Sequence, residues 1–188
     1  AKTKAAVEEY LRLLDRIEGE NLDANISIKP TMLGLKIDPD LCAENLAMIV
    51  KRAADLRNFV RIDMEDHTCT DATLRIYHEL QPKYGNLGVV FQSYMRRTLQ
   101  DIEEMPPTGG NVRLCKGIYI EPRTMAWKGY QTVRNNFVMA LEKIVYDEVR
   151  VGVLHHGVGA FTVSDVVIAE SSGAPIIGLN FRANAPAR

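Results

Sequence analysis

Strand-like and helix-like patterns alternate along this chain, and that alternation restricts its fold more than any other feature. Six short runs rich in branched apolar residues each follow a stretch in which apolar residues recur every three or four positions. Strands separated by helices pair in parallel and are joined by right-handed crossovers. We therefore predict an α/β fold with a mainly parallel six-stranded sheet, formed by residues 1–188 as a single domain.

The expected elements have recognisable start and stop signals. Asp38 and Pro39 have the order of a helix cap and a first-turn proline, and Thr162 with Asp165 has the spacing of a capping box. Strands are expected at 25–29, 59–63, 87–92, 111–116, 149–154 and 175–180, and helices at 2–18, 38–56, 70–81, 96–104, 130–145 and 162–171.

The length leaves two arrangements open for this sheet. Eight-stranded barrels typically need about 250 residues, whereas this chain has 188 residues and six expected strands. The sheet is therefore either open and doubly wound or a partial barrel. In both arrangements edge strands stay exposed, and self-association through them is the partner interaction that we expect.

Composition excludes several classes of function. The net charge of −1 gives no overall attraction to nucleic acid or to an anionic membrane, and no apolar run is long enough to span a bilayer. The 3 cysteines are widely spaced without a CxxC pair, which indicates a reducing, cytoplasmic environment. His155 and His156 point to opposite sides if they lie on a strand, so no metal site is expected.

Polar residues end four of the expected strands. Lys29, Asp63, Gln92 and Lys116 stand at these ends, and Arg113 lies just before the last of them. Since the carboxyl ends of parallel strands meet on one face, we expect a shared site there. The same residues also fit a solvated rim or a satisfied polar cluster, and the pattern alone does not separate these readings.

Four motifs along the first three quarters of the chain resemble one family in order and in spacing. They are SIK at 27–29, RIDMED at 61–66, VFQSY at 90–94 and VRLCKGIY at 112–119. Together they resemble strands two to five of the flavin-dependent proline dehydrogenase barrel. The likeness, which we extend over residues 1–146, implies a fragment of that barrel.

That resemblance implies a role for each matched position. Members of the family transfer a hydride equivalent from L-proline to FAD and release pyrroline-5-carboxylate. By resemblance Lys29 matches the active-site lysine, Asp63 its carboxylate partner beside the substrate, and Tyr119 the tyrosine that shapes the proline pocket. The implied flavin contacts are Met64, Val90, Gln92, Arg113, Lys116 and Gly117.

From about residue 147 the resemblance changes to another family. EVRVGVLHHGVG at 148–159, SDVVI at 164–168 and IIGLNFR at 176–182 resemble the third domain of bacterial translation initiation factor two. We identify no catalytic residue in this part. Nothing in the sequence matches the proline dehydrogenase helix whose tyrosine and arginine pair bind the substrate carboxylate.

Two functions follow from these resemblances. The first is an engineered α/β chimera, a scaffold without native catalytic activity, because both resemblances are partial and meet without a Gly, Pro or Ser linker at 140–150. The alternative is an FAD-dependent flavoprotein that oxidises L-proline, or one that retains flavin binding only.

Overall fold

The computed structural model describes residues 2–105, 110–146, 149–150, 153–155, 157 and 160–177. The chain divides into two compact units, Ala1–Val151 and Gly152–Arg188, which are described one at a time. The prediction that residues 1–188 form a single domain stays a prediction.

The first unit contains five α-helices, a short 3-10 helix and six strands among its described residues. The helices are α1 (Lys2–Gly19), η1 (Pro30–Leu33), α2 (Pro39–Asp55), α3 (His67–Tyr84), α4 (Thr98–Glu103) and α5 (Tyr130–Lys143). The strands are β1 (Ile26–Ile28), β2 (Val60–Ile62), β3 (Leu87–Gln92), β4 (Asn111–Cys115), β5 (Val145–Tyr146) and β6 (Val149–Arg150).

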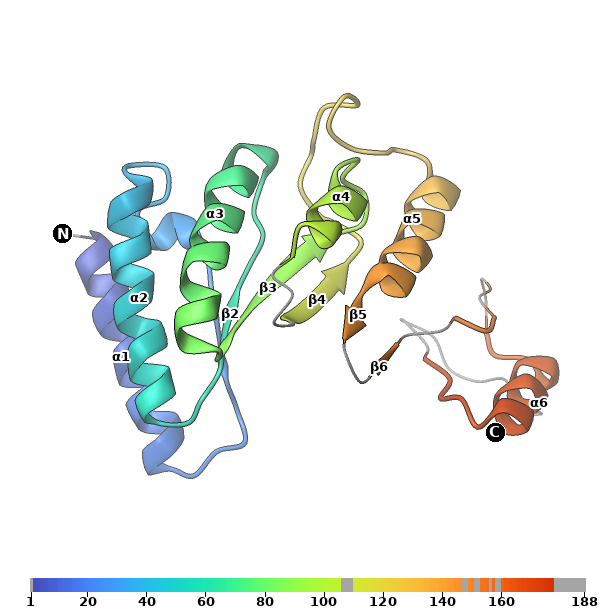
Figure 1. Ribbon diagram of the computed structural model, residues 1–188, viewed down its shortest axis with the longest axis horizontal. Coiled ribbons are helices and arrows are strands. Elements are labelled where there is room, and N and C mark those ends of the chain that lie inside the picture. Colours follow the sequence, from blue (N-terminus) through green and yellow to red (C-terminus); the bar gives the residue numbers. More distant parts are fainter. Residues whose placement is uncertain are drawn as a thin grey trace. The chain divides into compact units, whose positions relative to one another are not determined.

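The first four strands form one parallel sheet in the order β1-β2-β3-β4. Right-handed crossovers between strands added in one direction place all the connecting helices on the same face of a sheet. In Figure 1, α1, α2 and α3 lie side by side along the first strands, as in one wall of a barrel. The partial-barrel alternative therefore holds for these strands, and the doubly wound alternative, which needs a reversal of strand order, is wrong for them.

We expected six strands in one mainly parallel sheet, but in the described residues that sheet contains four strands. The run expected at 149–154 contributes β6, but β6 pairs antiparallel with β5 in a separate two-stranded ribbon. Residues 153–154 and 175–177 are not in strands, and residues 178–180 lie outside the described part. Two-residue strands cannot bury an apolar face of their own, which explains why the apolar pattern overestimated them.

Local sequence signals determine where the helices begin and end. The Asp38 carboxylate accepts a hydrogen bond of 2.9 Å from the Asp40 amide and Pro39 occupies the first turn, as predicted for α2. Gly85 ends α3 in the left-handed conformation, with φ of 73°. α3 starts at His67, three residues before the expected start, because Asp66 caps it.

The core of the first unit lies between the helices and the sheet. Every residue of β3 is buried, whereas β1 and β2 bury alternate residues. The largest fully buried side chains include Tyr77, Leu14, Ile28, Leu33, Leu46, Ile49, Ile62, Ile76 and Leu87. The strand β3, which has a neighbour on each side, is therefore the most completely buried strand of this sheet.

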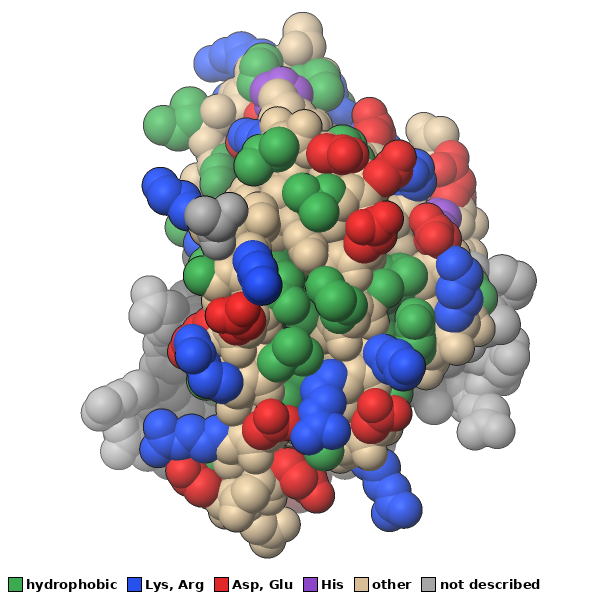
Figure 2. Space-filling view, turned by 90° about the vertical axis from the view of Figure 1, so that its left-hand side faces the viewer, with side chains coloured by type: hydrophobic (Ala, Val, Ile, Leu, Met, Phe, Trp, Pro, Cys, Tyr) green, Lys and Arg blue, Asp and Glu red, His purple; other side chains and the backbone are tan. Residues whose placement is uncertain are grey.

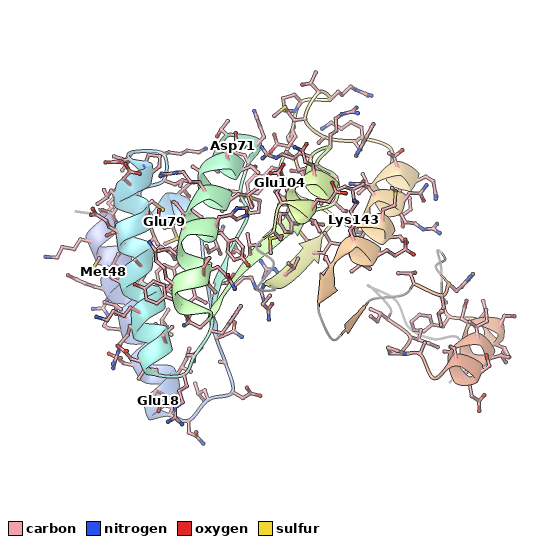
Figure 3. The ribbon with its side chains drawn as sticks, in the orientation of Figure 1. Glu18, Met48, Asp71, Glu79, Glu104 and Lys143 are labelled. Atoms are coloured by element: carbon pink, nitrogen blue, oxygen red, sulfur yellow. The ribbon has the colours of Figure 1, made fainter. Side chains whose placement is uncertain are left out.

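Ion pairs connect α4 to both of its neighbours. Arg97 at the start of α4 pairs with Asp71 of α3 at 2.5 Å and with Asp101 at 2.9 Å. Glu103 at the other end of α4 pairs with Lys143 of α5. Figure 3 labels Asp71 and Lys143, the outer members of this set.

The outer face formed by α1 and α2 carries charges of both signs. Figure 2 shows acidic and basic side chains interspersed among scattered apolar ones on this face. Met48 of α2, which is half exposed, is one of the apolar residues on the surface of this helix. Mixed charges give no strong field of one sign over this face.

The second unit contains α6 (Val163–Ser172) among its described residues. Thr162 and Asp165 form the predicted capping box, and the Thr162 amide donates to Asp165 Oδ2 at 2.7 Å. No residue of α6 is buried. Within the described part of the chain, no helix has the length and apolarity that crossing a membrane requires.

Candidate functional site

The register of the four parallel strands sorts their side chains into two faces. Ile26, Ile28, Val60 and Ile62 are buried in the core beneath the helices. The residues that alternate with them point to the opposite face. One row on this face crosses the sheet through Ser27, Arg61, Gly88 and Asn111. Nearer the carboxyl ends, Val90 pairs with Arg113, and Lys29 and Asp63 directly follow β1 and β2. These four residues are called the second row.

In the first row, Arg61 reaches across the central strand. Its guanidinium donates to the Asn111 backbone carbonyl at 2.8 Å and also to the Asn111 side chain. Gly88 lies between the two residues. A Cβ atom added there would stand 2.5 Å from the Asn111 carbonyl oxygen and 2.6 Å from Arg61 Nη1. Glycine is therefore required for this crossing, and it joins β2 to β4 over β3.

The second row repeats the crossing nearer the carboxyl ends of the strands. Arg113 of β4 forms an ion pair with Asp63, over Val90 of β3. The Asp63 carboxylate also accepts a hydrogen bond of 2.7 Å from Ser27. Sequence reasoning identified Asp63, Val90 and Arg113 but not the Ser27 contact, because a serine within a strand has no distinguishing pattern.

Lys29 differs from the pairing that we expected. It is exposed and precedes η1, and among the described residues its side chain has no ion pair. The Asp63 amide donates to the Ile28 carbonyl at 2.9 Å, so the Lys29 and Asp63 backbones are adjacent. The Asp63 carboxylate, which we expected to pair with Lys29, binds Arg113 and Ser27 instead.

Gln92 and Glu65 form a chain of contacts behind this row. The Gln92 side-chain amide donates to the Glu65 carbonyl at 2.9 Å. The Glu65 carboxylate, which is buried, accepts from the Thr31 amide at 2.9 Å and from the Thr31 hydroxyl at 2.8 Å. Because Thr31 is in the first turn of η1, Glu65 holds the backbone that carries Lys29.

The acidic residues at 63–66 therefore have separate partners. Asp63 binds Arg113, Glu65 binds Thr31, and Asp66 pairs with Lys36 at 2.7 Å. Hydrogen bonds from Lys36 and from Thr68 lower the pKa of Asp66 to about 2. The sequence pattern did not reveal that Glu65 is buried.

The segment after β4 carries the remaining predicted residues that approach this face. Gly117 has φ of 106°, and a Cβ atom there would stand 2.2 Å from the Tyr94 ring. The Lys116 ammonium lies 5.9 Å from the centre of the Tyr130 ring. Burial raises the pKa of Tyr119, and the nearby Glu65 and Asp63 carboxylates raise it further. The Tyr119 phenol is thus close to the acidic end of β2.

Met64 and Val90 are buried at 8% and 2% exposure, and Met64 packs in the main core cluster. Both residues can offer only apolar edges to a ligand. The side chains with exposed charge on this face are those of Lys29, Arg113 and Lys116.

This arrangement suits an anionic or readily reduced planar ligand. The Arg113 side chain is 51% exposed, so part of its guanidinium faces outward while Asp63 holds the rest. Fixed cations stabilise negative charge that develops on a reduced flavin ring. The set of cations, one buried amide and apolar edges therefore fits FAD in charge and in chemistry.

Comparisons with known proteins assign the two ends of the chain to different families. The family model described as Translation-initiation factor 2 matches residues 134–188. The translation initiation factor IF-2 of Jannaschia sp. is 71% identical over 51 residues, which are 27% of this chain and 6% of that protein. The change of family lies inside α5, before the predicted change at residues 146 and 147.

The longer part of the chain matches the family model described as Proline dehydrogenase, over residues 1–131. Proline dehydrogenase 2 of Bacillus subtilis is 34% identical over 136 residues, which are 72% of this chain and 45% of that protein. The chain thus spans less than half the length of this relative.

A solved structure of proline utilization A with proline bound in remote sites has the same fold over 76% of this chain and 18% of its own. The TM-score is 0.66 at 16% sequence identity. The parallel half-barrel, the four motifs and the family match lead to one conclusion. The chain belongs to the proline dehydrogenase family through residues 1–131, and it joins this part to a translation initiation factor 2 fragment at residues 134–188.

Proposed function

We propose that this chain is a flavin-binding scaffold that holds FAD against the open face of its half-barrel and does not oxidise proline by itself. The observation that carries this proposal is the second row, in which Asp63 and Arg113 meet over Val90 beside Lys29. FAD supplies the hydride acceptor of proline dehydrogenases. Arg113, Lys116 and Gln92 would hold it here, through charge and hydrogen bonding.

The Asp63–Arg113 pair also supports the absence of turnover. A cation that is already neutralised by a carboxylate stabilises developing negative charge on a flavin less than a free cation does. The same carboxylate is then occupied and does not pair with Lys29. Both effects lower the reactivity of the row without preventing FAD from binding.

A flavin-binding experiment tests this proposal. The purified chain is incubated with FAD and desalted, and the retained flavin absorbance is measured. Arg113→Ala and Gln92→Ala should each weaken FAD binding about tenfold or more, because each removes a hydrogen-bonding group. Arg75→Ala is the matched control, since Arg75 makes only an exposed ion pair with Asp40. Equal retention of flavin in all of these variants contradicts the assignment.

Proline oxidation is the second candidate function. Tyr119 favours it, because burial and then the Glu65 and Asp63 carboxylates raise the pKa of this phenol, and the family resemblance assigns Tyr119 to the proline pocket. Addition of L-proline to the FAD-loaded chain under anaerobic conditions separates the two candidates. If L-proline bleaches the flavin band and Asp63→Asn abolishes this bleaching, the chain is a proline dehydrogenase. If the band does not change, the chain is the flavin-binding scaffold.

We also propose that the fusion is engineered. Two unrelated families meet between residues 131 and 134, within one helix and without a flexible linker. Natural fusions join complete domains through exposed linkers. Recovery of the same continuous reading frame from genomic DNA contradicts this origin.

Self-association through edge strands is a further proposal. In the described sheet β1 and β4 each have one neighbour, and β4 is only partly buried. Edge strands with unpaired backbone groups associate with other chains. Sedimentation velocity over a concentration series tests this proposal, and a monomer at every concentration contradicts it.

A further inference from the structure

The segment that joins β4 to α5, residues 116–129, is called the strap below. Figure 1 shows it at the end of the sheet toward which β3 and β4 point. Near its beginning, the Tyr94 amide donates to the Lys116 carbonyl at 2.9 Å. Near its end, the Trp127 amide donates to the Tyr94 carbonyl at 2.7 Å, and Met95 forms a β-bridge with Ala126. Both ends of the strap are therefore attached to the residues that follow β3.

The middle of the strap is attached to a different element through Glu121. The side chain of Glu121 is 1% exposed, and its Oε1 accepts a hydrogen bond of 2.8 Å from the His67 amide. Its Oε2 contacts His67 Nδ1. His67 is the first residue of α3, so the carboxylate binds the positive end of that helix. Glu121 and His67 are 54 positions apart in the sequence.

Other groups around Glu121 reinforce this placement. Lys128 Nζ donates to the Glu121 carbonyl at 2.5 Å and folds the strap on itself. Burial and the Glu121 carboxylate together raise the pKa of Tyr94 to about 12. Asp66, beside His67, is occupied by Lys36 and Thr68. Burying a carboxylate without hydrogen-bond partners costs free energy. Glu121 has these partners when the strap is closed, and when the strap opens its carboxylate must be hydrated by water instead.

We propose that the Glu121–His67 contact is a latch that keeps the strap closed over the carboxyl ends of the strands. Tyr119 lies two residues before Glu121, so the latch also positions the phenol near Asp63 and Glu65. Glu121 and His67 act as positioning residues. The role of Tyr119 toward a ligand rests on the proposed function, whereas the closing of the strap does not.

The only tryptophan of the chain reports on the strap without any ligand. Trp127 lies within the strap, and the Arg96 guanidinium stands 3.5 Å from the centre of its ring. The Trp127 end of the strap is itself bonded to Tyr94, so opening that extends from Glu121 to this end separates the pair and exposes the indole. Trp127 fluorescence and its quenching by acrylamide therefore report on the latch in the full chain and in the absence of flavin.

Three latch variants and one control make the test. Glu121→Ala removes two charge-assisted hydrogen bonds and should raise the open population about tenfold, with at least a twofold rise in the quenching constant. Glu121→Gln keeps the acceptor for the His67 amide and should restore most of the protection. His67→Ala keeps the amide and should give an intermediate result. Glu104→Ala removes an exposed carboxylate of the same charge from the end of α4 and should change nothing (Figure 3).

The outcomes separate the latch from the flavin proposal. If Glu121→Ala and His67→Ala fold with unchanged circular dichroism and wild-type quenching, the latch is wrong. If Glu121→Ala fails to fold, His67→Ala decides in the same way. Faster release of FAD from Glu121→Ala supports both proposals, whereas a chain that binds no FAD but shows the expected Trp127 response contradicts the proposed function and leaves the latch intact.

Discussion

Gly88 and Arg61 lie near the centre of the sheet. Because Gly88 of β3 has no side chain, Arg61 of β2 can contact β4, which is not its neighbour in the sheet. Arg61 and Asn111 interact across β3 only because Gly88 leaves the space open. The Arg61 guanidinium also lies 4.9 Å from the centre of the Phe59 ring, which fixes its direction. The size of residue 88 therefore decides whether β2 and β4 are joined.

Gly88→Ala should lower the free energy of unfolding by about 2 kcal/mol or more, which is typical of overpacking in a buried position. The added methyl group meets backbone and ring atoms 2.5 Å away, and these cannot move independently. Gly19→Ala is the matched control, because no atom lies within 4 Å of its Cβ position. Urea denaturation measures both variants. Equal stability of the two would show that β3 shifts to accept the methyl group.

Asp66 should make the stability of the protein depend on acid. Its pKa is about 2 in the folded state, below the ordinary value of 3.8. A lowered folded-state pKa stabilises the fold above the unfolded pKa, and this stabilisation disappears as the pH falls toward 2. Asp66→Asn keeps a capping group and should cost about 1 kcal/mol at pH 7, discounted for partial exposure of the ion pair. The cost should vanish near pH 2, and a cost that is independent of pH contradicts the Lys36 pairing.

At the scale of elements, the helix α5 is the part that joins the two families. Its sequence belongs mostly to the region that matches the initiation factor, yet it packs against α4 and β4 of the first unit. The side-chain amide of Asn136, which is buried, donates to the Ser93 carbonyl at 2.6 Å. One hydrogen bond thus connects a residue of one family match to the end of β3 in the other.

Asn136→Ala should destabilise the first unit by about 1–2 kcal/mol, because it leaves the buried Ser93 carbonyl without this donor. Asn135→Ala is the matched control from the adjacent position. Asn135 is exposed and bonds only the Gln131 side chain, at 2.8 Å, so its loss should cost close to nothing. Thermal unfolding followed by circular dichroism compares the two. A larger loss for Asn135 would mean that α5 is rotated about its axis.

Most of these elements were predictable from sequence, because they depend on local signals. The Asp38 cap, the Thr162–Asp165 capping box and the apolar run at 87–92 each determined an element by themselves. Contacts between elements were not predictable in this way. The partners of Glu65 and Glu121 lie 34 and 54 positions away, and nothing in the residue types at those positions distinguishes them. The pairing of β6 also depends on a neighbouring strand and not on its own apolar pattern.

At the scale of the whole molecule, the boundary between families and the boundary between units do not coincide. The family models meet between residues 131 and 134, and the compact units divide after Val151. A chain cut at the first boundary loses α5, whereas a chain cut at the second keeps it. The two boundaries therefore predict opposite results for truncation.

Residues 1–151 should fold by themselves, with a melting temperature within a few degrees of the full chain, since the first unit has its own core. Residues 1–131 should fold poorly or aggregate, because loss of α5 exposes the apolar side of α4 and β4. Circular dichroism and differential scanning fluorimetry measure both chains. If residues 1–131 unfold cooperatively at the melting temperature of the full chain, α5 is not needed to cover α4 and β4.

The position of α5 has a practical meaning for exchanging fragments between proteins. A breakpoint can lie inside a helix when the incoming sequence supplies the few side chains that the recipient's backbone needs, as Asn136 does for Ser93. Searches for interchangeable fragments would then rank candidate helices by the polar groups they must satisfy on the recipient sheet. Overall likeness between the donor and recipient domains becomes a secondary criterion.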